Sequence, residues 1–150
     1  MGTDSSIAVA VSGKRNGAPR RLGRSVGAIF AGFVAVVILS LGTDAVMHAA
    51  GIFPPWGQAM SEALFVLATV YRTIYGIAGA YITARLAPRR PMLHAMVGCA
   101  VGMVLATAGA VATWNRGPEF GPHWYPIALI VLAPPTAWVG GRLRELQLGM

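Results

Sequence analysis

Four blocks of apolar residues, separated by short polar segments, follow one another along the chain. They cover residues 26–50, 61–86, 92–114 and 126–143. An α-helix rises about 1.5 Å per residue and the hydrocarbon core of a bilayer is ~30 Å thick, so about 20 apolar residues can cross it. The pattern therefore predicts an all-α membrane protein with four transmembrane helices in a compact bundle.

The fourth block is the shortest, and the consecutive prolines Pro134 and Pro135 interrupt it. Proline removes a backbone N–H and with it one helical hydrogen bond. Membrane helices tolerate this where neighbouring groups satisfy the freed carbonyl. We therefore expect a spanning helix that is kinked at Pro134-Pro135, and a re-entrant segment is the alternative.

The positions of the basic residues predict how the helices are oriented. All 12 Lys and Arg residues except Arg72 and Arg116 lie before the first block, in or next to the turn between the second and third blocks, or near the end of the chain. Basic residues accumulate in the cytoplasmic flanks of membrane helices, so both termini should be cytoplasmic. The aromatic residues of the other two connections then lie at the outer boundary, where an interfacial belt is expected.

Composition supports the membrane assignment. The chain of 150 residues is 55% hydrophobic and 11% charged, whereas a soluble domain carries about 25% charged residues. We expect residues 1–24 to be a disordered basic cytoplasmic tail and residues 25–145 to be the transmembrane domain. The expected partner is the lipid bilayer of a cell membrane, with a bacterial inner membrane as the first choice. The net charge of +7 does not predict nucleic-acid binding, because the basic residues do not alternate with base-stacking aromatics.

Small residues recur at helical spacing in the second and third blocks. The third block contains Gly98 and Gly102 four residues apart, and the second contains Gly76 and Gly79. Such stripes let helix backbones approach closely in a membrane. We expect the second and third helices to be tight neighbours, and a homodimer interface is the alternative use of the stripes.

Arg72 is the most informative polar residue, because it lies about 15 Å into the second helix, near the middle of a bilayer. An arginine at that depth costs ~2.5–3.5 kcal/mol on insertion scales, so it should have a partner. Asp44 leans toward it from the first helix, and we predict an Asp44–Arg72 contact. Tyr71 and Tyr75 could add hydroxyl groups, and His48 follows Asp44 by one helical turn. The pair is either a structural bridge or a polar site that holds a ligand.

The two outer connections are predicted to form an ordered cap over the bundle. Gly and Pro restrict the backbone around Trp114, and Arg116 and Glu119 are spaced to pair within this turn. The cap is either structural or the surface that meets a partner. Its proposed residues are Trp56, Trp114, Asn115, Arg116 and Glu119.

The function predicted from these features is transport or ligand binding at an intramembrane polar site formed by Asp44 and Arg72. The alternative is a non-catalytic accessory or structural subunit that packs against a larger membrane complex. The sequence contains no recognised catalytic set, metal-ligand motif or phosphate-binding loop, so it favours a protein that is not an enzyme and needs no cofactor or metal.

Overall fold

The structure is a computed structural model that describes residues 18–149, with side chains from residue 21. In this part of the chain it contains four long helices, a short 3-10 turn and no strand. Residues 1–17 of the predicted tail lie outside the described residues. The helices are α2 (Ala18–Ala49), α3 (Glu62–Leu86), α4 (Pro91–Thr113) and α5 (Trp124–Gln147), with the turn η1 (Pro118–Phe120) between α4 and α5.

Local sequence explains where the central helices begin and end. Ser61 has extended dihedral angles and precedes α3, and Glu62 places a carboxylate in the first turn, near the positive end of the helix dipole. Pro88 follows the end of α3, and Pro91 is the first residue of α4, where its missing N–H costs no helical hydrogen bond. Arg90 between them has a φ of 49°, in the left-handed region, so the chain reverses within four residues.

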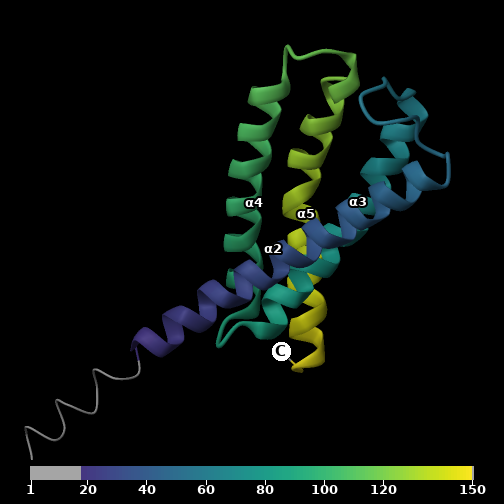
Figure 1. The fold of residues 1–150 in the computed structure, drawn as a ribbon. Helices are drawn as coiled ribbons and strands as arrows, with labels where there is room; N and C mark the ends of the chain where they lie inside the picture. The colour runs from purple at the N-terminus through teal and green to yellow at the C-terminus, as the bar shows by residue number, and fades with distance from the viewer. Residues whose placement is uncertain (1–17, 150) are drawn as a thin grey trace, which may run out of the picture.

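Helix α2 is longer than predicted. It begins at Ala18 rather than at residue 26, so residues 18–24 are helical rather than part of an irregular tail. Its 32 residues correspond to a length of about 48 Å, more than a bilayer core requires. In Figure 1, α2 crosses the other helices obliquely.

Helix α5 continues through Pro134 and Pro135. The two prolines leave the carbonyl groups of Ile130 and Val131 without their helical N–H donors. The 24 residues of α5 form one helix of about 36 Å, which is a spanning length rather than a re-entrant segment. The kink at this site stays a prediction.

The connections lie at two ends of the bundle (Figure 1). We call the end with the α2–α3 and α4–α5 connections the Trp end, because it holds Trp56 and Trp114. The opposite end, with the α3–α4 turn and the C-terminal part of α5, is called the Arg end. Helix α3 packs against each of the other three helices, and α5 packs against α3 and α4. Helices α2 and α4 meet near the Arg end and diverge toward the Trp end, so the bundle is open on one side.

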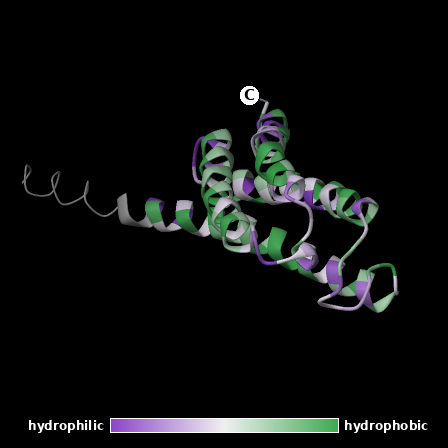
Figure 2. Ribbon diagram, turned by 90° about the horizontal axis from the view of Figure 1, so that it is seen from above, coloured by the Kyte–Doolittle hydropathy of each residue, from purple (hydrophilic) through white to green (hydrophobic). Residues whose placement is uncertain are grey.

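The outer surface of the bundle is apolar. All four helices are long and apolar enough to span a membrane. In their most hydrophobic windows only 6–22% of the residues are buried, so most apolar side chains lie on the outside. Figure 2 shows that hydrophobic residues recur along the helices. In water such an apolar surface would be strongly unfavourable, whereas lipid would solvate it well.

Glycine positions set the close helix contacts, but not between the helices we predicted. Gly79 packs against α2, where a β-carbon would lie 2.9 Å from the carbonyl oxygen of Gly32. Gly76 faces Thr136 of α5 rather than α4. Gly98 only loosely approaches α2 and α3, and around Gly102 a β-carbon would meet nothing within 4 Å. The expectation that these stripes join α3 tightly to α4 is therefore wrong.

Candidate functional site

The Asp44–Arg72 contact predicted from the sequence is present at the interface of α2 and α3. Nη2 of Arg72 donates a hydrogen bond to Oδ2 of Asp44 at 2.5 Å. The two helices are antiparallel and side chains lean toward the N-terminus of their own helix, so the two groups lean toward each other. The Asp44 side chain is 12% exposed and that of Arg72 is 30% exposed, so the carboxylate lies deeper in the protein than the guanidinium.

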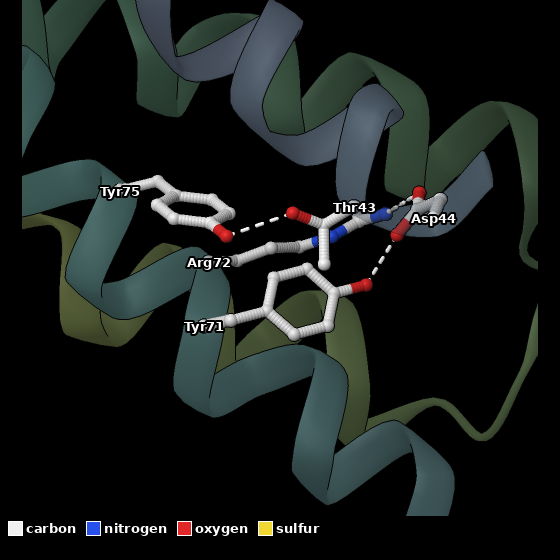
Figure 3. Close-up of polar contacts among 5 residues, drawn as sticks. All are labelled: Thr43, Asp44, Tyr71, Arg72 and Tyr75. Carbon is white, nitrogen blue, oxygen red and sulfur yellow. Dashed lines mark hydrogen bonds and ion pairs between the residues drawn. The ribbon is translucent and has the colours of Figure 1, made fainter. Parts of the chain in front are cut away.

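Two tyrosines complete the polar cluster (Figure 3). The hydroxyl of Tyr71 donates to Oδ1 of Asp44, so each carboxylate oxygen has a partner. The hydroxyl of Tyr75 does not reach Asp44 and instead shares a 2.7 Å hydrogen bond with Thr43. Both tyrosines come from α3, one helical turn apart, and they fasten it to adjacent residues of α2.

Arg72 is only partly satisfied by this cluster. Its guanidinium carbon lies 5.8 Å from the ring centroid of Tyr125, on α5, within cation–π range. Its Nε atom is buried and has no hydrogen-bond partner among the described residues. A buried N–H without an acceptor costs free energy, which makes Nε the one atom of the cluster that calls for a further acceptor.

His48 does not join the cluster, although it lies one helical turn after Asp44. Its Nδ1 is 2.7 Å from the carbonyl oxygen of Pro54, and its ring lies 3.7 Å from that of Trp56. The imidazole is therefore held by the α2–α3 connection. The acid–base pair of Asp44 with His48 that the spacing allows is not formed.

The two connections at the Trp end are each ordered by their own contacts. Trp56 packs on His48, whereas Trp114 stacks on His123 with 4.2 Å between ring centroids. Asn115 lines a hollow of 540 Å³ together with this stacked pair. Asn115, Arg116 and Glu119 are exposed, and among the described ion pairs there is none between Arg116 and Glu119. That predicted pairing is therefore wrong, and whether the connections act as a cap stays a prediction.

A crevice of 440 Å³ lies beside the cluster, between the diverging helices α2 and α4. Helices α3 and α5 also contribute to its lining, which is mostly apolar but includes the hydroxyl groups of Ser40, Thr73, Thr83 and Thr136. Arg72 is the only charged residue in the lining. The volume falls in the range of ~300–1,000 Å³ that is usual for small-molecule sites.

Metal binding has no support in the described part of the chain. Residues 18–149 contain no group of three or more His, Cys, Asp or Glu side chains that could hold a metal ion. The chemistry available at the site is therefore that of a guanidinium, a carboxylate and phenolic hydroxyls.

Comparison with known proteins does not add a function: no protein-family model, no curated protein and no solved structure matches the chain. The sequence analysis missed three features of the site, namely Thr43, the ring of Tyr125 next to Arg72, and the crevice. Thr43 is adjacent to Asp44, which is a local signal. The position of Tyr125 depends on how α5 packs, and hydropathy does not contain that information.

Proposed function

We propose that this protein binds a small anionic ligand at Arg72, beside Asp44, and acts as a membrane ligand-binding protein or transporter. The observation that carries the proposal is the incomplete satisfaction of Arg72. Its Nε is buried without an acceptor, and the same side chain lines a crevice of ligand size. Carboxylate and phosphate oxygens are the acceptors that a guanidinium binds best.

A purely structural bridge fits these contacts less well. Such a bridge is favourable only when the geometry satisfies the remaining donors, because two charges must be desolvated. Asp44 meets this condition, since each of its oxygens accepts a hydrogen bond. Arg72 does not, and it is the more exposed partner. The asymmetry supports a role for Arg72 toward a third group.

The proposal includes the placement of the chain in a bacterial inner membrane with both termini in the cytoplasm. The support is the separation of residue types between the two ends of the bundle. Arg89, Arg90, Arg142 and Arg144 belong to the Arg end, whereas Phe53, Trp56 and Trp114 belong to the Trp end. Basic residues favour the cytoplasmic side.

Ligand-induced stabilisation tests this function. The purified protein in mild detergent would be heated with acetate, inorganic phosphate or octanoate, each at matched ionic strength. We expect at least one of these anions to raise the unfolding midpoint of the wild type, and the increase to vanish in Arg72→Gln. Arg89→Gln is the matched control, because Arg89 is exposed in the α3–α4 turn, and it should respond like the wild type.

A response that Arg72→Gln retains in full would contradict the proposal. The competing function is an accessory subunit that would dock on α4, the helix whose hydrophobic window has the smallest share of buried residues, 6%. In that case a larger membrane protein should co-purify in mild detergent, and none of the three anions should stabilise the chain.

A further inference from the structure

The crevice next to Arg72 opens sideways, toward the space that lipid would occupy. It is lined from α2 by Phe33, Val37 and Leu41 and from α4 by Ala106, and all four of these residues are exposed. Helices α2 and α4 diverge on this side of the bundle (Figure 1). A ligand could therefore enter laterally from a bilayer and need not come from water.

The crevice is also elongated. Its lining on α3 extends from Arg72 to Thr83, which corresponds to about 16 Å along the helix axis. The charged group is at one end of this stretch and small residues such as Gly79 and Gly98 follow toward the other. A charged end and an elongated, mostly apolar body match the shape of an amphiphile.

The polar end of the crevice favours a head group with oxygen atoms that accept hydrogen bonds. Arg72 is the only charged residue in the lining, and Asp44 lies outside the lining, with both carboxylate oxygens engaged. From inside the crevice, a ligand therefore meets the guanidinium.

We propose that the ligand of this site is a single-tailed carboxylate amphiphile, of the long-chain fatty-acid class, with its carboxylate on Arg72 and its hydrocarbon tail in the crevice. This inference rests on the proposed function and deepens it. The volume of 440 Å³ is near the lower end of the range for ligand pockets, which favours one tail over a two-tailed lipid.

A carboxylic head suits this site because it can bind with or without its own proton. The Asp44–Arg72 pair is neutral, so a second permanent negative charge in a low-dielectric environment would be costly. A carboxylic acid can bring a proton along and still offer a carbonyl oxygen to the guanidinium of Arg72. A permanently charged sulfonate or phosphate diester head does not have this option.

Recognition should come from the head group and from the shape of the crevice. The tail of an amphiphile in a bilayer is already in an apolar solvent, so moving it into the crevice gains little hydrophobic free energy. The inference therefore predicts a strong dependence on Arg72 and on the width of the crevice, and only a weak dependence on tail length once the tail fills it.

Photo-crosslinking tests the inference directly. The full chain in nanodiscs of zwitterionic lipid would be irradiated with hexadecanoic acid that carries a diazirine in its tail. We expect adducts on α2 and α4 residues that line the crevice, and we expect hexadecanoate to compete for labelling. Hexadecanol and hexadecyltrimethylammonium, which lack the carboxylate, should not compete.

Two α4 variants form a matched pair for this experiment. Gly102 lines the crevice and a β-carbon there meets nothing within 4 Å, so Gly102→Leu should direct a bulky side chain into the crevice and abolish labelling. Ala100→Leu adds the same side chain at an exposed α4 position outside the crevice and should label like the wild type. Far-ultraviolet circular dichroism of both variants checks that they fold.

Equal labelling of Gly102→Leu and wild type would overturn the inference, as would competition by hexadecanol as strong as that by hexadecanoate. Neither result would overturn the proposed function if an anion such as acetate still stabilised the protein through Arg72. Loss of every Arg72-dependent anion response would instead overturn both.

Discussion

Nη2 of Arg72 and Oδ2 of Asp44 lie 2.5 Å apart, in a contact that joins α2 to α3 across 28 positions of sequence. The Asp44 side chain is 12% exposed, whereas that of Arg72 is 30% exposed and lines a mostly apolar crevice. Both oxygens of Asp44 thus have hydrogen-bond partners, whereas the Arg72 side chain has an unpartnered donor and borders the crevice. This asymmetry has consequences for stability that differ from those of a closed structural bridge.

Removing both charges should be tolerated better than removing one. Arg72→Leu alone leaves a buried carboxylate without its cation, which costs about 3 kcal/mol of unfolding free energy. The double variant Asp44→Leu with Arg72→Leu leaves no unpaired charge, and we expect it to be at least as stable as the wild type. Unfolding in mixed detergent micelles measures both values.

A double variant that is no more stable than Arg72→Leu would contradict a functional role of the pair. If the double variant is destabilised as much as Arg72→Leu alone, the contact is a structural clamp. The ligand site would then have to be sought at the connections of the Trp end.

The two tyrosines of α3 should differ in their contribution to stability. Tyr71 donates to the charged Asp44, whereas Tyr75 bonds to the neutral Thr43. Hydrogen bonds to ionised groups are the stronger class, while interhelical hydrogen bonds in membranes average only about 0.6 kcal/mol. We expect Tyr71→Phe to cost about 1–2 kcal/mol and Tyr75→Phe about 0.6 kcal/mol in the same unfolding assay. Equal losses would mean that the ionisation of Asp44 adds nothing to its bond with Tyr71.

The sequence was sufficient for the helices and for one long-range contact. Apolar blocks define the four helices because the length of a membrane span is a physical constant of the bilayer. The Asp44–Arg72 contact followed because an intramembrane arginine must have a partner and the first two helices are antiparallel neighbours. His48 shows the limit of this reasoning. Its spacing points toward Asp44, but the carbonyl oxygen of Pro54 and the ring of Trp56 compete for the imidazole.

The small-residue stripes show a second limit. Periodicity indicates that a helix has a face suited to close packing, but it does not name the helix that packs there. Gly79 meets Gly32 of α2, and Gly140 of α5 packs against the backbone of α3 near Ile77. The crevice was unpredictable for the same reason, because it lies where α2 and α4 diverge, and periodicity does not determine how the helices cross.

Gly79 and Gly102 should respond in opposite ways to the same small substitution. A β-carbon at Gly79 would clash with Val36 and lie 2.9 Å from a backbone carbonyl oxygen of Gly32, whereas one at Gly102 meets nothing within 4 Å. Gly79→Ala should therefore destabilise the protein by about 1–3 kcal/mol, the usual cost of overpacking. Gly102→Ala should leave stability unchanged or raise it slightly, because alanine is the better helix former. Unfolding midpoints of the two variants in one detergent provide the comparison. A tolerated Gly79→Ala would mean that α2 and α3 are less closely packed than this contact implies.

Cysteine labelling in cells tests the proposed orientation. Cys99, the only cysteine of the chain, would first be replaced by alanine, which fits its partly buried place in α4. Gln58→Cys then places a thiol in the exposed α2–α3 connection at the Trp end, and Arg89→Cys places one in the exposed α3–α4 turn. With both termini in the cytoplasm, a membrane-impermeant maleimide added to intact spheroplasts should label Gln58→Cys at once. It should label Arg89→Cys only after the membrane is permeabilised. Labelling of Arg89→Cys in intact spheroplasts, with Gln58→Cys protected, would show that the Arg end faces outward. Arg72 and the charged end of the crevice would then lie nearer the cytoplasmic leaflet.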